Sequence, residues 1–98
     1  MNNVIKKAEY WRTGDIYSIF TSQLFLKLKE KIDASVYVAN HDDTLVVCIN
    51  KGPICYRYEM SSFGNKLLGG LDTNTVVNTI LADYKVFLMK IFFYDYRR

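Results

Sequence analysis

The sequence is poor in the residues that most catalytic and metal sites require. It contains one histidine and two cysteines in 98 residues, and their spacing does not resemble a zinc site. Gly69 and Gly70 lack the downstream lysine and hydroxyl residue of a phosphate-binding loop. His41, Asp42 and Asp43 either form a polar turn, as such residues usually do, or offer a base or metal ligand. We expect the turn, and no enzyme activity, cofactor or metal.

Long apolar runs are also absent. Residues 1–7 lack the apolar core of a signal peptide, and no later run approaches the roughly 18 residues of a membrane span. The sequence therefore predicts a cytoplasmic protein with no membrane partner. Cysteines in that compartment are usually reduced. Cys48 and Cys55 are expected to face each other across a hairpin, either as inert free thiols or as a redox pair or disulfide. We expect inert thiols, since neither cysteine lies at a helix N-terminus, where thiolates are activated.

Aromatic residues are abundant instead. Eight Tyr, six Phe and one Trp make up 15% of the chain, and such side chains fill cores and anchor interfaces. Half of all residues are hydrophobic and 23% are charged, a composition typical of a globular protein. The length fits a single domain over 1–98 with a modest core. The net charge of +3 permits weak attraction to nucleic acid without requiring it.

Helical spacing of apolar residues marks a first helix over 15–33. The polar residues at 13–15 offer caps at its start. Five apolar residues then follow at intervals of four, which places them on one face: Ile16, Phe20, Leu24, Leu28 and Ile32. The preceding residues 1–14 are expected to form an N-terminal segment, with a short helix over 3–11.

Three strands are expected within 35–60, in antiparallel order. Four-residue loops at 40–43 and 50–53 would join them, because a two-residue turn just before Pro53 would need that proline to donate a closing hydrogen bond. The cross-strand pairs are then Val38–Leu45, Val36–Val47, Ile49–Ile54, Val47–Tyr56 and Leu45–Tyr58. This register gathers the apolar side chains on one face of the sheet, and a slip by one residue would scatter them.

That face is expected to lie under the helices. Its members are Val36, Val38, Leu45, Val47, Ile49, Ile54, Tyr56 and Tyr58. Arg57 and Glu59 alternate with them and should stay on the uncovered face. The predicted fold class is therefore α+β: an α-β-β-β-α chain whose three-stranded antiparallel meander has both helices packed on one face.

A last helix over 72–96 begins with strong signals. Asp72 is a good N-cap, and Leu71 and Val76 occupy the positions of a hydrophobic staple. At about 1.5 Å per residue this helix is longer than a typical strand, so its last turns should overhang the sheet. The overhang is expected to carry large aromatic side chains and a basic residue: Phe92, Phe93, Tyr94, Tyr96 and Arg97. Either the first helix or another chain, including a second copy, is expected to cover at least one of its phenylalanines.

The uncovered sheet face offers a second candidate surface. Tyr37, Val46 and Arg57 are expected to line up across the three strands. An arginine above a tyrosine, beside an aliphatic side chain, is typical of an interface core. These three residues and the helical overhang are the candidate partner-binding residues.

The chain is short, rich in Lys, Asn, Tyr and Ile, and free of catalytic motifs. With its α-β-β-β-α order it resembles small proteins encoded by phages and prophages of low-GC Gram-positive bacteria, among them anti-CRISPR inhibitors. The same element order occurs in double-stranded RNA-binding domains. Here, however, the loop at 40–43 is acidic apart from its histidine, and the last helix opens without a lysine. That second likeness is therefore an analogy of fold alone.

The phage resemblance implies a function in the host bacterial cytosol. It implies a phage-encoded binding protein that inhibits a host defence complex, in the first place a CRISPR nuclease, by stoichiometric protein–protein binding. The partner would be a host protein or ribonucleoprotein complex. Many such inhibitors imitate DNA with an acidic face, whereas this chain is net basic. The alternative is a small nucleic-acid-binding or regulatory phage protein that uses its scattered lysines and arginines.

Overall fold

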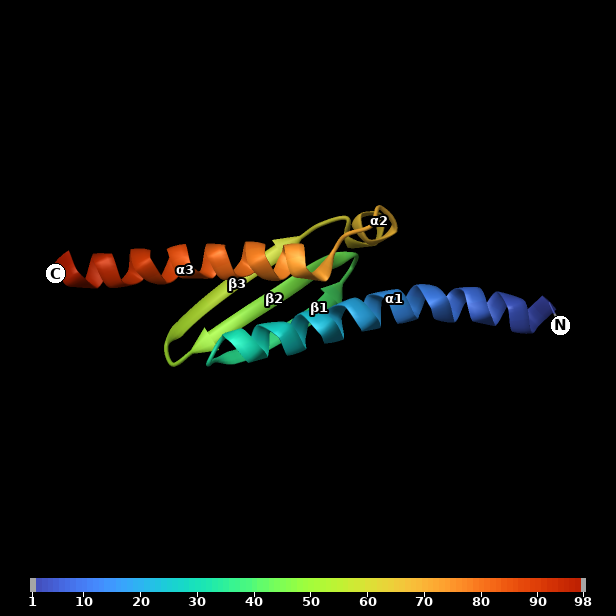
Figure 1. Cartoon of the computed structure of the whole chain (residues 1–98), viewed down its shortest axis with the longest axis horizontal. Helices are drawn as coiled ribbons and strands as arrows, with labels where there is room; N and C mark the ends of the chain where they lie inside the picture. Colours follow the sequence, from blue (N-terminus) through green and yellow to red (C-terminus); the bar gives the residue numbers. More distant parts are fainter. Residues whose placement is uncertain (1, 98) are drawn as a thin grey trace.

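The computed structural model of the chain describes the backbone of residues 2–97 and the side chains of residues 16–93. Three strands form one antiparallel sheet in the order β1-β2-β3, and three helices accompany them (Figure 1). The elements are α1 (Asn2–Lys31), β1 (Ser35–His41), β2 (Thr44–Lys51), β3 (Ile54–Met60), α2 (Phe63–Leu68) and α3 (Thr73–Arg97). The predicted α+β meander is thereby confirmed, with the short α2 added to it.

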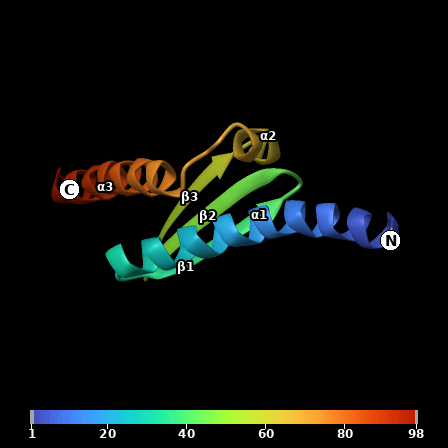
Figure 2. The same ribbon diagram turned by 45° about the vertical axis from the view of Figure 1, so that its right-hand side comes forward.

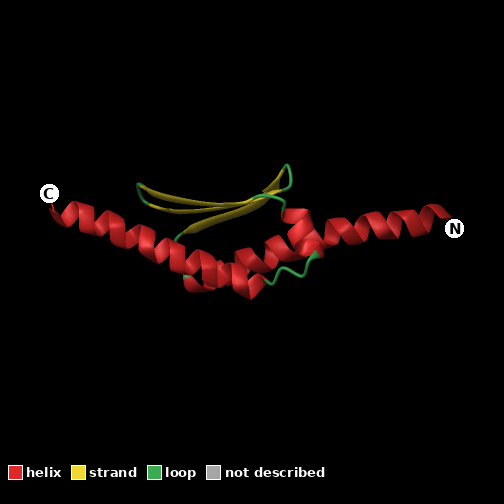
Figure 3. Cartoon of the chain, turned by 90° about the horizontal axis from the view of Figure 1, so that it is seen from above, coloured by secondary structure: helices red, strands yellow, loops and turns green. Residues whose placement is uncertain are grey.

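The helices and the sheet form two layers. Seen from above, the sheet lies on one side and the helices on the other (Figure 3). A view turned by 45° shows α1 crossing the strands diagonally (Figure 2). The N-terminal part of α1 projects beyond the sheet at one end of the molecule, and the C-terminal part of α3 projects at the other (Figure 1). The chain therefore extends over 67 × 21 × 21 Å.

The hairpin loops are shorter than the sequence suggested, and the predicted register is wrong by two residues in both hairpins. Val38 pairs with Val47, and Val47 pairs with Tyr58. Asp42 and Asp43 have φ of 48° and 61°, the left-handed conformation that a two-residue hairpin turn requires. In the second turn, Gly52 (φ 59°) and Pro53 are the two central residues. Because Lys51 and Ile54 form the closing pair, the proline nitrogen has no hydrogen bond to donate there.

A shift by two residues leaves every side chain on its predicted face, because side chains alternate with a period of two. Four of the eight residues predicted to lie under the helices are buried: Leu45, Val47, Ile49 and Tyr56. The other four are half-buried: Val36, Val38, Ile54 and Tyr58. Arg57 and Glu59 are exposed, as predicted. The pattern of faces is confirmed, although the cross-strand pairs differ.

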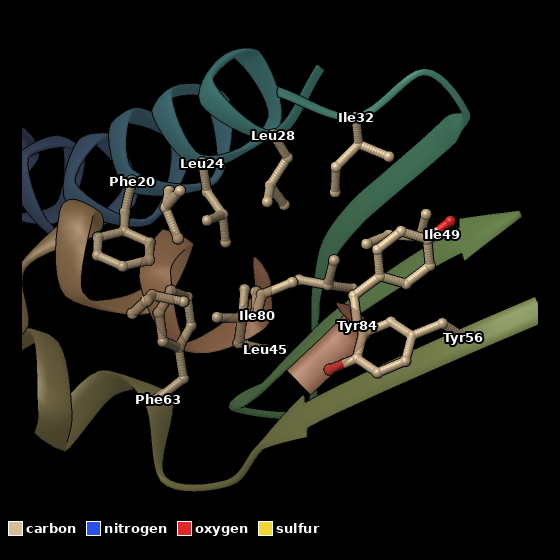
Figure 4. Packing of buried hydrophobic residues seen from close by; sticks show 13 residues of the cluster. Phe20, Leu24, Leu28, Ile32, Leu45, Ile49, Tyr56, Phe63, Ile80 and Tyr84 are labelled. Atoms are coloured by element: carbon tan, nitrogen blue, oxygen red, sulfur yellow. The ribbon is translucent and has the colours of Figure 1, made fainter. Parts of the chain in front are cut away.

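The core forms where α1, α3 and the sheet meet (Figure 4). Four of the five regularly spaced apolar residues of α1 are buried there: Phe20, Leu24, Leu28 and Ile32. From α3 come Val76, Val77, Ile80 and Tyr84. Ile16, one turn earlier on α1, is 40% exposed.

The boundaries of α3 agree with the sequence, whereas those of α1 do not. The carboxylate of Asp72 accepts a hydrogen bond from the Thr75 backbone N–H (3.1 Å), which confirms the predicted N-cap. The break predicted at 13–15 is absent, because α1 runs continuously from Asn2 to Lys31. Glycine inside a helix costs only about 0.5–1 kcal/mol relative to alanine, so Gly14 alone does not end it.

The connection after β3 contains α2, whose start is held by a distant residue. Ser62, at the N-cap position, has φ 54° and makes no side-chain capping bond. Instead, Asp43 in the first hairpin turn accepts hydrogen bonds from two backbone N–H groups, from Phe63 at its carbonyl (2.9 Å) and from Gly64 at its carboxylate (2.7 Å). The cluster of His41 and two aspartates thus forms the expected turn, and this turn also caps a helix.

Candidate functional site

On the uncovered sheet face, the register separates the three residues that were expected to line up. Tyr37 and Arg57 both pair with Cys48, so these three form one row across the strands. Val46 belongs to the next row, between Ala39 and Glu59. It is only 3% exposed and therefore offers little surface to a partner. The predicted grouping of Tyr37, Val46 and Arg57 is wrong because the register of both hairpins differs by two residues from the predicted one.

The polar groups on this face already have partners within the sheet. The Arg57 guanidinium lies 2.7 Å from the Glu59 carboxylate, and this hydrogen-bonded pair raises the pKa of Arg57. The Tyr37 hydroxyl lies 3.1 Å from His41 Nε2. A docking partner would have to compete with both contacts, which makes this face a weak candidate for binding.

The cysteines do not face each other, contrary to the prediction. Cys48 lies opposite Arg57, whereas Cys55 lies opposite Asn50. Both thiols are free. The Cys48 Sγ lies 4.0 Å from an Arg57 nitrogen, a contact at the limit of a weak hydrogen bond. The shorter hairpin loop explains the error, because it moves each residue of β3 two places along β2.

The overhang of α3 carries two large aromatic side chains that are more than half exposed. Phe92 and Phe93 are 62% and 57% exposed, so the first helix covers neither to the extent predicted. The reason is the offset of the helices, since α1 ends at Lys31 while α3 continues beyond the sheet. Tyr94, Tyr96 and Arg97 lie in the same helix, but their side chains are outside the described residues.

Phe92 lines a groove that no stretch of sequence suggested. The groove has a volume of about 460 Å³ and is formed by the end of α1, the β2–β3 hairpin and the middle of α3. Its apolar lining includes Ile32, Ile54, Leu81, Tyr84, Leu88 and Phe92. Lys31, Lys51 and Lys85 also line it, with Asp33 as the single acidic residue. We call this site the basic groove. It combines an apolar surface with three positive charges.

A separate apolar surface lies on the side of α3 that faces away from the sheet. Val86, Met89 and Phe93 are about half exposed or more and, with Lys90, line a shallow hollow. We call Ala82, Val86, Met89 and Phe93 the outer stripe. The sheet-facing residues, from Val77 to Phe87, follow a different phase of the same helix. The signal for the outer stripe was present in the sequence as a second series of apolar residues, out of phase with the first.

Among the described residues, no group of three or more His, Cys, Asp and Glu side chains is placed to hold a metal ion. The shortest contact between titratable groups across two elements joins the Tyr56 hydroxyl to Asp83 Oδ2, at 2.5 Å. Burial, reinforced by this hydrogen bond, raises the pKa of Tyr56, so the phenol stays neutral at physiological pH.

The Tyr56–Asp83 pair predicts a loss of stability at alkaline pH. Because the pKa of Tyr56 is raised in the folded state, its contribution to stability is complete below about pH 10 and declines as the pH rises further. We expect the melting temperature to fall more steeply between about pH 10 and pH 12 in the wild type than in Tyr56→Phe. Equal slopes in differential scanning calorimetry would show that this phenol is not coupled to folding.

Two further findings bear on function. Within the part of the chain that the structure describes, no helix is long and apolar enough to cross a membrane. Comparisons of the chain with protein-family models, with curated proteins and with solved structures found no match. The basic groove and the outer stripe are the two surfaces from which a function can be inferred.

Proposed function

We propose that this protein acts by stoichiometric binding and seats a segment of a partner protein in the basic groove. The observation that carries the proposal is the composition of that groove, in which the partly or largely exposed side chains of Ile54, Leu88 and Phe92 offer apolar contact beside three lysines. An apolar centre with a charged rim is the usual arrangement of a protein interface. The complementary segment would carry an apolar anchor flanked by Asp or Glu.

The class of partner follows from the resemblance of the chain to small phage proteins. We propose a bacterial defence complex as the target, in the first place a CRISPR nuclease. The protein would inhibit this target by binding, in the basic groove, a segment of it that contains apolar and acidic residues. Such an inhibitor needs no turnover.

Nucleic-acid binding is the competing function. Its support is the same three lysines, which could neutralise phosphates. An apolar lining of aliphatic residues suits a peptide better than a phosphate backbone, and Phe92 is the single exposed aromatic residue of the groove on which a base could stack. We therefore favour a protein partner, and the experiment below separates the two.

The test uses two groove variants, Phe92→Asp and Lys51→Glu, with purified CRISPR effector complexes as the probes. We expect one complex to bind the wild type at a ratio of one to one and to lose target-DNA cleavage. Each variant should weaken binding about tenfold or more, because loss of an anchor or a rim charge removes on the order of 1.4 kcal/mol or more. Phe92 and Lys51 are exposed, so both variants should fold normally.

Two matched controls lie outside the lining of the groove. Leu26→Asp introduces the same charge at a residue of α1 that is 60% exposed, compared with 62% for Phe92. Lys66→Glu reverses an exposed lysine on α2. Both should bind as the wild type does. Failure to bind any effector complex would reject the proposed target. Tight binding to plain DNA or RNA that weakens steeply with salt and is lost in Lys51→Glu would instead favour the nucleic-acid function.

A further inference from the structure

We infer that α3 pairs with α3 of a second copy of the chain through the outer stripe, with the two helices antiparallel. The pairing uses the side of α3 opposite the sheet and does not depend on the basic groove. Ala82, Val86, Met89 and Phe93 are spaced by four, three and four residues. This is the heptad spacing with which helices pack along a common seam.

The stripe is placed for contact with another helix. Ala82 is exposed, and so are the three larger members of the stripe, of which Met89 is the most exposed at 62%. The residues that alternate with them, Tyr84 and Phe87, pack against Tyr56 of the sheet. The stripe therefore lies on the opposite side of a helix that is already anchored, so little further ordering would be needed for binding.

Side-chain volumes favour the antiparallel direction. When two helices run in opposite directions, a register that places Val86 opposite Met89 of the second copy also places Ala82 opposite Phe93. Each layer then combines a smaller side chain with a larger one, as close packing requires. In a parallel pair every residue would meet its own copy. Phe93 would then be crowded and Ala82 would leave a void.

Charges at the edges of the seam favour the same direction. In the antiparallel register, Asp83 of each copy lies beside Lys90 of the other, which gives two symmetric attractive contacts. In a parallel pair, Lys85 of one copy would instead lie beside Lys90 of the other, and these like charges would repel. Asp83 already accepts one hydrogen bond from Tyr56, but a carboxylate has further acceptor positions for a lysine.

The offset of the helices adds a geometric reason. A two-fold axis between Val86 and Met89 places the overhang of each α3 alongside the sheet-packed half of the other. The exposed part of the Phe93 side chain would thus lie against the second copy. The stripe has few residues, so the interface is small, and we expect a dissociation constant on the order of 1–100 µM.

The experiment is sedimentation equilibrium of the full chain from about 5 to 500 µM, a range that spans the expected dissociation constant. We expect a reversible monomer–dimer equilibrium for the wild type. Met89→Asp should remain monomeric at every concentration, while circular dichroism shows an unchanged fold. Leu26→Asp, at a residue of similar exposure on α1, should dimerise normally. A wild type that stays monomeric throughout, or a Met89→Asp variant that still dimerises, would overturn the inference.

Two further measurements test the direction of the helices. Lys90→Glu should weaken an antiparallel dimer because it would face Asp83, whereas it should strengthen a parallel one because it would face Lys85. Spin labels on Asn78→Cys, with both native cysteines replaced by serine, should lie about 28 Å apart along the helix axis in the antiparallel pair, at about 1.5 Å per residue. Labels side by side, together with tighter association of Lys90→Glu, would establish the parallel pair and reject our assignment.

Discussion

Replacement of Phe63 by alanine is expected to lower the free energy of unfolding by about 3–5 kcal/mol. Phe63 is fully buried, and its ring contacts those of Tyr17 and Phe20 at centroid distances of 5.5 and 5.4 Å. It is the one fully buried residue of the six-residue α2, where Leu67 is only partly buried, so this side chain provides most of the apolar packing of that helix. Alanine would leave a cavity that the surrounding aromatic rings can fill only in part.

Urea denaturation monitored by circular dichroism measures this effect. The matched control is Leu68→Ala on the same helix, because Leu68 is 81% exposed. Its expected change is within about 0.5 kcal/mol. Similar losses for the two variants would mean that α2 is held by something other than its phenylalanine.

Asp43→Ala is expected to lower the free energy of unfolding by about 2 kcal/mol, the next largest effect. The substitution removes the carboxylate that accepts from the Gly64 N–H and from the Tyr17 hydroxyl, and loss of a helix cap costs about 0.5–2 kcal/mol. Asp43 also has φ 61°, a conformation that alanine tolerates less well than aspartate. The contact needs a glycine at 64, where a Cβ atom would collide with the Tyr17 hydroxyl.

Two other substitutions separate the causes. Asp43→Asn keeps an acceptor oxygen and tolerates the left-handed conformation, so it should stay close to the wild type. Asp43→Gly relieves the backbone but loses the cap, and it should fall between asparagine and alanine. Thermal and urea unfolding of the three variants provide the measurement. The same stability for all three would show that the turn does not support α2.

The sequence predicted the fold where the periodicity of apolar residues is unambiguous. Alternation in the strands assigned the covered face correctly, and Asp72 marked the start of the last helix. The register could not be obtained in this way, because a shift by two residues preserves every face. The turn residues decided it instead. Asp42 with Asp43, and Gly52 with Pro53, form two-residue turns that the sequence reasoning had replaced with longer loops.

The candidate sites were predictable to a smaller extent. The overhang of the last helix followed from its length, but the exposure of both Phe92 and Phe93 within the chain did not, because the first helix was one of the two elements expected to cover them. The basic groove did not, because Lys31, Lys51 and Lys85 come from three elements whose packing is not encoded in any one segment. The outer stripe could have been predicted from the sequence, because the last helix contains a second series of apolar residues besides the series that was assigned to the core.

The projection of two helices from opposite ends gives the monomer an unusual hydrodynamic profile. Its radius of gyration of 16.6 Å exceeds the roughly 13 Å of a compact chain of this length. Greater friction makes such a molecule diffuse slowly, so a monomer should elute from a gel-filtration column ahead of globular standards of its own mass. Elution volume would therefore suggest a dimer even where none exists. Only methods that report mass independently of shape can distinguish elongation from self-association in this protein.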